Sequence, residues 1–182
     1  VLAGQRKAFY ELRMRAVDGE AGEIARDLLD HAVAALVSRH APDGVVPDDR
    51  DVASMAQDFR MRLGIPLSPE LLRESGSMIA DAALAAMAAK RAEKIARADE
   101  QVYAELERYI VVSSLDIAWR NHVAALEHLR SVVSLRAYGG RDPLTEFRTE
   151  AVEMYEALVE AAAFSVATGL AFASVKPRAA AA

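Results

Sequence analysis

The feature that most constrains this chain is the run of residues 77–133, which contains neither proline nor glycine. A run without helix breakers predicts one continuous helix, or two nearly collinear ones, up to about 85 Å long at 1.5 Å per residue. In its second half, residues recur at three- and four-residue spacing, as on one helix face. This stripe comprises Val112, Leu115, Trp119, His122, Leu126, Leu129 and Val133. A helix of this length needs neighbours to bury the stripe.

A turn follows the long run and separates it from a second helical pattern. Asp142 is a good N-cap, and Pro143 suits the first helical position, where no amide donor is needed. Helical spacing then resumes at Phe147 and continues to Leu158. Two apolar stripes joined by a short loop predict an antiparallel helical hairpin. Its tip comprises Leu135, Arg136, Ala137, Tyr138, Gly139, Gly140 and Arg141.

Shorter helices are expected before the long run. The first covers residues 4–17 with an apolar face of Ala8, Leu12 and Val17. Others cover residues 20–40 and 47–63, and a short one follows Ser68-Pro69-Glu70 until Gly76 kinks or ends it. The boundary between this bundle and the hairpin is placed near Asp99. The fold class predicted is all-α, a helical bundle followed by a long antiparallel hairpin.

Composition narrows the protein class further. The chain is 53% hydrophobic and has a net charge of −5, which argues against general nucleic-acid binding. It has no cysteine, so disulfides, thiolate metal sites and thiol nucleophiles are excluded. The apolar segment 161–175 is shorter than the about 20 residues of a membrane-spanning helix, which favours a buried or interfacial helix end. Because the sequence opens on Val1 without a signal-peptide pattern, we expect the numbering to begin inside a longer polypeptide.

Motifs for chemistry are missing from the sequence. No G-x-x-x-x-G-K-[ST] loop occurs, so we expect no nucleotide hydrolysis by this chain alone, and we predict no catalytic residues. The four histidines lack the spacing that would place two of them on one helix face toward a metal. His122 is interpreted as a neutral imidazole hydrogen-bonded across the hairpin, and Trp119 as a packing residue. With them, Leu126 and Leu129 form the predicted packing set of the hairpin.

The tip carries the candidate binding residues. Between residues 117 and 141, four arginines stand against one acid, a local charge of +3 on an acidic chain. Tyr138, between Arg136 and Arg141, could contact a polypeptide or an anionic surface through its ring and the neighbouring guanidinium groups. The alternative is a solvated loop with Tyr138 folded back.

The hairpin resembles the two-helix finger of the SecA family, the motor ATPases of bacterial preprotein translocation. The residues that carry this resemblance are Leu115-Asp116, Trp119, His122, Ala124-Ala125, Leu129-Arg130, Leu135-Arg136, Tyr138, Asp142-Pro143 and Glu146-Phe147. Residues 5–13, which include Gln5, Tyr10 and Arg13, are similar to the end of the long scaffold helix of that family.

The resemblance implies an organisation and a set of partners. Residues 1–18 would end a long scaffold helix, 19–98 would form a helical wing, 99–175 the scaffold with its two-helix finger, and 176–182 a tail. Tyr138 would contact unfolded preprotein at the mouth of the SecYEG channel. No cofactor is expected in this chain; ATP and magnesium would bind other SecA domains.

The same resemblance implies a cytoplasmic protein peripheral to the inner membrane, associated through the translocon or the lipid surface. Truncation of a scaffold helix would expose apolar surface, so we also expect a homodimer to be able to form. The rival class is a stand-alone helical adaptor, a chaperone-like module that binds partner helices or unfolded polypeptide without a motor.

Overall fold

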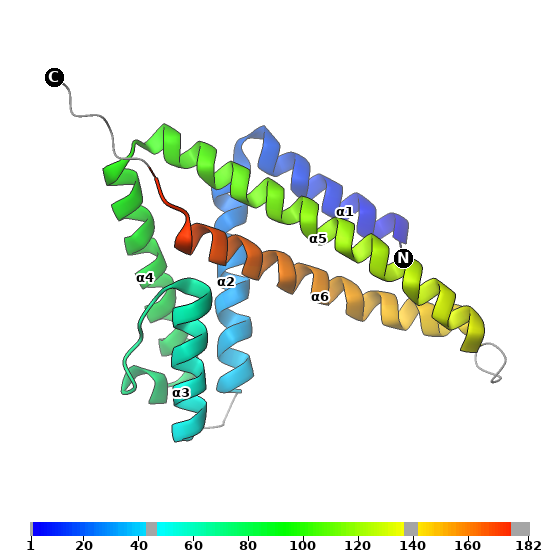
Figure 1. Ribbon diagram of the computed structural model, residues 1–182, viewed down its shortest axis with the longest axis horizontal. Helices are drawn as coiled ribbons and strands as arrows, with labels where there is room; N and C mark the ends of the chain where they lie inside the picture. Colours follow the sequence, from blue (N-terminus) through cyan, green and yellow to red (C-terminus); the bar gives the residue numbers. More distant parts are fainter. Residues whose placement is uncertain (1, 43–46, 137–141, 176–182) are drawn as a thin grey trace.

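The computed structural model describes residues 2–42, 47–136 and 142–175, and these form helices joined by short connections (Figure 1). No strand occurs within these ranges. The six α-helices are α1 (Leu2–Arg15), α2 (Ala21–His40), α3 (Asp49–Asp58), α4 (Gly76–Arg97), α5 (Glu100–Arg136) and α6 (Pro143–Phe172). The all-α prediction is therefore confirmed.

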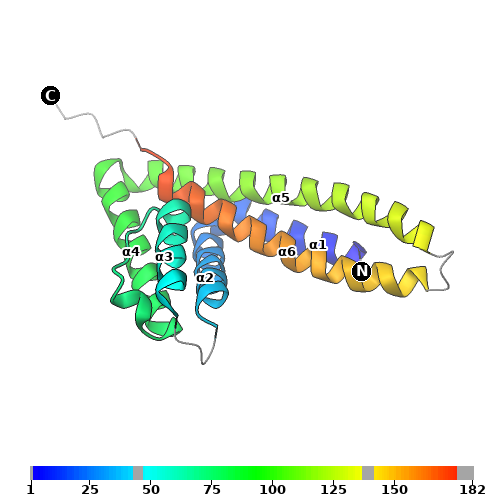
Figure 2. The same cartoon turned by 60° about the horizontal axis from the view of Figure 1, so that its bottom comes forward.

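The helices form two parts that we call the bundle and the arm. The bundle contains α2, α3 and α4, and the arm contains α1, α5 and α6, which run side by side and extend far beyond the bundle (Figures 1 and 2). α5 runs antiparallel to both α1 and α6 (Figure 1). A kink at Gly19, whose φ is 120°, redirects the chain from α1 into α2.

One main core joins the bundle to the base of the arm. It takes buried side chains from all six α-helices, including Phe9, Leu36, Met55, Ile79, Leu115 and Val166. Apolar residues at helical spacing are buried or partly buried in the second and third helices: Ile24, Leu28, Val33 and Leu36, and Val52, Met55, Ala56 and Phe59. In the bundle, the helical spacing of apolar residues therefore indicates correctly which side chains are buried.

Caps fix where the helices begin and end. Asp48 accepts hydrogen bonds from the amides of Arg50 and Asp51 in a capping box at the start of α3. Gly64 closes the helical turn after α3 in a left-handed conformation with φ 64°. Asp142 accepts from the amide of Leu144, and Pro143 opens α6, as the sequence predicted.

Two expectations about the helices are wrong. α4 and α5 are not collinear: they turn sharply at Ala98–Asp99, where the Asp99 side chain accepts a hydrogen bond from the amide of Gln101 (Figure 1). An aspartate N-cap can therefore start a new helix just after another ends, without proline or glycine. Gly76 also begins α4, under a Ser75 cap, rather than ending the preceding turn at Leu71–Arg73.

The predicted apolar face of the first helix is wrong too. Ala8 and Val17 are exposed, whereas the buried residues are Gln5, Phe9 and Ala16, with Leu12 partly buried. The buried face of the first helix starts at Gln5, a polar residue that a pattern of hydrophobic residues does not include. Gln5 can be buried because it has hydrogen-bond partners there.

α6 is the one helix among the described residues that is long and apolar enough to cross a membrane. A core helix of a soluble fold passes the same test of length and composition. Much of its second half is small and buried in the main core: Leu158, Ala162, Ala163, Val166, Ala167, Leu170 and Ala171. Those residues form the predicted buried helix end.

Candidate functional site

The arm is the part of the molecule that carries the predicted site. α5 and α6 contact each other more extensively than any other two helices. At 1.5 Å per residue, the 37 residues of α5 span about 55 Å. Small residues bring the two helices close, and a side chain at Gly169 would place its Cβ 2.7 Å from Cγ2 of Ile110. Ser165 also donates a 2.9 Å hydrogen bond to Ser114 across the pair.

An aromatic cluster locks α1 onto the hairpin. The Phe9 ring of α1 stacks on Trp119 of α5, with centroids 5.2 Å apart. Trp119 lies 5.6 Å from the His122 ring, which meets Tyr155 of α6 edge-on at 5.9 Å. Trp119 and His122 thus occupy the interface of three helices, and such ring pairs add to the free energy gained by burial.

Gln5 connects the same three helices by hydrogen bonds. Its Nε2 donates to the carbonyl oxygen of Ala151 at 2.8 Å. Its Oε1 lies 3.3 Å from Nε2 of His122, within hydrogen-bonding distance. Burial lowers the pKa of His122, although a hydrogen bond to the Met154 backbone opposes the shift. The imidazole is therefore neutral near pH 7 and acts as a structural link.

An ion pair closes the outer edge of this interface. Arg13 of α1 donates to both carboxylate oxygens of Asp116 on α5, at 2.5 and 3.1 Å. The hydrogen bond to Asp116 raises the pKa of Arg13. A bidentate guanidinium–carboxylate pair fixes orientation as well as distance. α1 is thereby held in one register along α5.

Beyond the aromatic cluster, the hairpin has a small core of its own. Leu126, Leu129 and Val133 of α5 pack with Ala151 of α6 in a cluster separate from the main core. Phe147 and Met154, partly buried, complete it. The predicted stripe of α5 therefore continues into the far part of the arm, where two helices and the start of α1 supply the contacts.

Most of the predicted binding residues fall outside the part of the chain that the structure describes. Leu135 and Arg136 are in the last turn of α5, and their side chains lie outside the described residues. Ala137, Tyr138, Gly139, Gly140 and Arg141 also lie outside them. The described helix ends nearest to them in sequence, Arg136 of α5 and Pro143 of α6, lie at the far end of the arm (Figure 1).

Comparison with known proteins decides the family. A profile described as the SecA wing and scaffold domain matches residues 1–173. The chain belongs to this family. It is 33% identical over 162 residues to the protein translocase subunit SecA of Afipia carboxidovorans, and 35% identical over 162 residues to SecA 1 of Nitrobacter hamburgensis. SecA 1 of Rhodopseudomonas palustris is also similar, at 33% identity.

The match covers the chain almost completely but its relatives only in part. In each of the three relatives, 85% of this chain aligns with 17% of the SecA sequence. The chain thus corresponds to the wing and scaffold region of SecA. The family resemblance inferred from the hairpin residues is confirmed.

Several residues that build this SecA hairpin were not singled out by sequence reasoning. Gln5, Phe9 and Tyr155 join the three arm helices, yet only Gln5 was noted, as part of the family resemblance. A signal was available for two of them, because Gln5 and Phe9 are four residues apart and share one helix face. A signal was available for Tyr155 too, because it lies three residues before Leu158 on the same helix face.

Proposed function

We propose that this chain acts as the wing and scaffold of a SecA-type protein translocase, and that its hairpin is a two-helix finger. In this proposal Tyr138 contacts an unfolded preprotein, and Arg136 and Arg141 assist at the fingertip. The finger works at the SecYEG channel and transmits motion from an ATPase. The role is mechanical, so this chain makes and breaks no bonds.

The observation that carries the proposal is the construction of the arm. A hairpin that delivers force needs stiffness at its base, and α1 supplies it through the Phe9–Trp119 stack and the Arg13–Asp116 ion pair. The arm also extends well past the bundle, so its end is free to enter a partner (Figure 2). The match to the SecA wing and scaffold domain supports the same reading.

The chemistry that drives such a finger would lie in other domains. The sequence lacks a phosphate-binding loop of the G-x-x-x-x-G-K-[ST] type, so ATP and magnesium are assigned to other SecA domains. The protein would then work in the cytoplasm at the inner membrane, held there by the translocon or the lipid surface.

A chimera tests the proposal directly. The wing and scaffold region of Nitrobacter hamburgensis SecA 1, the 35% identical relative, is replaced by this chain, and preprotein transport into SecYEG vesicles is measured. We expect transport by the chimera and its loss in the Tyr138→Ala variant. The matched control is Tyr109→Ala, since Tyr109 is 70% exposed on α5 away from the tip. Equal transport by both variants would contradict the fingertip role.

A photo-crosslinking experiment distinguishes preprotein contact at the fingertip from non-specific binding of unfolded polypeptide elsewhere on the surface. Benzoylphenylalanine is placed at position 138 or at position 109, and each protein is irradiated with an unfolded model preprotein. Crosslinks at 138 alone are expected.

The size of the native polypeptide distinguishes a part of a translocase motor from a stand-alone adaptor. It is read on a blot of source cells with an antibody against the hairpin. A band far above 19.7 kDa supports the motor, and a band at that size supports the stand-alone adaptor.

A further inference from the structure

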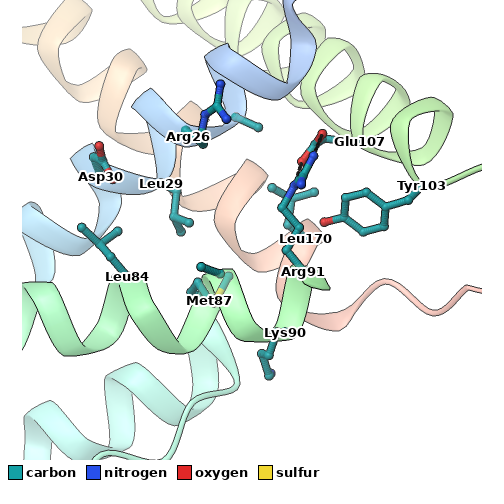
Figure 3. Close-up of a pocket in the computed structure, with 12 residues that line it drawn as sticks. Arg26, Leu29, Asp30, Leu84, Met87, Lys90, Arg91, Tyr103, Glu107 and Leu170 are labelled. Carbon is teal, nitrogen blue, oxygen red and sulfur yellow. Dashed lines mark hydrogen bonds and ion pairs between the residues drawn. The ribbon is translucent and has the colours of Figure 1, made fainter. Parts of the chain in front are cut away.

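A cavity lies where the bundle meets the base of the arm, away from the hairpin tip (Figure 3). It has a volume of about 260 Å³ and is bounded by α2, α4, α5 and the end of α6. Its walls are mainly apolar: Ala25, Leu29, Leu84, Met87, Ala88 and Leu170. Cavities with apolar walls and a few placed polar groups are the usual form of small-molecule sites.

Two of the polar groups around this cavity are already satisfied. Arg91 of α4 donates to both carboxylate oxygens of Glu107 on α5, each at 3.1 Å. Lys90 donates to the carbonyl oxygen of Gly64 at 2.8 Å. Glu107 is buried, so the bidentate pair neutralises a charge that would otherwise be costly to bury. These contacts shape the cavity and need no ligand.

The hydroxyl of Tyr103 is available at the wall of the cavity. The residue as a whole is 2% exposed, its hydroxyl makes no hydrogen bond to another residue within the described ranges, and its oxygen is not among the buried polar atoms that lack a partner. The ring lies under the Arg91 guanidinium, 5.2 Å from its Cζ, and the hydroxyl points toward Leu170 and Arg91 (Figure 3). Burial raises the pKa of Tyr103 to about 12, so the group keeps its proton and can donate a hydrogen bond to an acceptor in the cavity.

The charges of the lining favour an anionic ligand. The lining holds three basic residues, Arg26, Lys90 and Arg91, and two acids, Asp30 and Glu107, a net charge of +1. Arg26 has no ion-pair or hydrogen-bond partner in the part of the chain that the structure describes. The volume is below the about 300–1,000 Å³ of sites for drug-sized ligands, which suits a molecule of about ten non-hydrogen atoms.

We infer that this cavity binds a small monocarboxylate with a short apolar chain, whose carboxylate accepts a hydrogen bond from the Tyr103 hydroxyl while the chain lies along Leu84, Met87 and Leu170. The site is independent of the proposed role of the hairpin, because none of its lining residues belongs to the tip. Octanoate has ten non-hydrogen atoms and serves as the probe.

The first experiment uses the full chain with ¹³C-labelled methionine methyl groups. Met87 lines the cavity, whereas Met14 and Met61 are exposed elsewhere and serve as internal references. Octanoate is expected to shift the Met87 signal saturably, with a dissociation constant on the order of a millimolar for a ligand of this size. Octanol and octylammonium, of equal chain length, should bind several-fold more weakly. Equal binding of octanol, or equal shifts at all three methionines, would overturn the inference.

Matched variants then locate the site. Ala88→Trp fills the cavity and should abolish the Met87 shift, whereas Ala85→Trp, at an exposed position of the same helix outside the cavity, should not. Tyr103→Phe removes one donor and should weaken octanoate binding about fivefold. Circular dichroism checks that each variant is folded. Unchanged octanoate binding in both the Ala88→Trp and Tyr103→Phe variants would overturn the assignment.

Discussion

The base of the arm and its far part use the same two helices but are supported differently. At the base, Leu115 belongs to a core that draws side chains from all six α-helices. In the far part, Leu129 belongs to a separate cluster in which four of the described residues are buried. The free energy of holding a hairpin in place is therefore concentrated at its base. A far part with a small core of its own can tolerate contact with a partner without loosening the rest of the fold.

The largest expected effect is a loss of stability when a side chain in the main core at the base of the arm is shortened. Leu115→Ala leaves a cavity in the main core and should lower the free energy of unfolding by about 3–5 kcal/mol. Leu129→Ala, the same change four turns further along α5, should cost only about 2 kcal/mol, because the small cluster can relax around it. Urea unfolding of both variants gives the two values. Equal losses would mean that the far cluster is as firmly built as the main core.

A second prediction concerns the close approach of α5 and α6. Gly169→Ala should destabilise the protein by about 1–3 kcal/mol, because its Cβ would lie 2.7 Å from Cγ2 of Ile110. The matched control is Gly4→Ala in α1, where nothing lies within 4 Å and a small gain in stability of about 0.5–1 kcal/mol is expected. Thermal unfolding measures both. Combining Gly169→Ala with Ile110→Ala should cost less than the sum of the two single changes.

The third prediction uses pH to probe the aromatic cluster. The pKa of His122 is lowered in the folded protein, so the unfolded chain binds the proton more tightly. Stability should therefore be full above the unfolded pKa of about 6.5 and fall as the pH drops toward the folded value. One proton limits the slope to about 1.4 kcal/mol per pH unit.

Variants isolate this effect from other titrating groups. His122→Gln should flatten the dependence of the unfolding free energy on pH between 6.5 and the folded pKa. His128→Gln, at an exposed position six residues along the same helix, should leave the dependence as it is. A slope that survives in the His122 variant would assign the effect to another group.

The smallest expected effect lies at the start of α6. Asp142→Ala removes the cap on the Leu144 amide and should cost about 1 kcal/mol, whereas Asp142→Asn, which keeps a capping oxygen, should cost little. The hydrogen bond from Thr145 lowers the pKa of Asp142, so the difference should shrink in acid. Amide exchange in the first turn of α6 measures the local change. A loss that extends into the main core would show that the two parts of the arm are more strongly coupled than proposed.

Much of the arm could be predicted from the sequence because its signals are local. The three- and four-residue spacing of the α5 stripe and the Asp142-Pro143 start of α6 depend on neighbouring residues alone. Sequence reasoning failed where distant partners decide. Gln5 is buried with partners in His122 and Ala151, and α5 turns away from α4 because α5 packs mainly on α6 whereas α4 packs mainly on α2.

The cavity at the base of the arm had no sequence signal at all. Arg91 and Glu107 are sixteen residues apart on different helices, and only the sharp turn at Ala98–Asp99 brings them together. The predicted binding residue Tyr138 depended instead on family resemblance, and its contact with a preprotein stays a prediction.

Native-state hydrogen exchange tests most directly whether the arm is anchored at its base. The amides of Val111 and Leu115 should exchange only through global unfolding, with the full dependence on denaturant. Those of Leu129 and Val133 should exchange through a smaller opening that needs little denaturant and persists unchanged in the Gly4→Ala variant. Identical free energies and identical denaturant dependence at both ends of α5 would contradict this account, because the arm would then open only as one unit with the bundle.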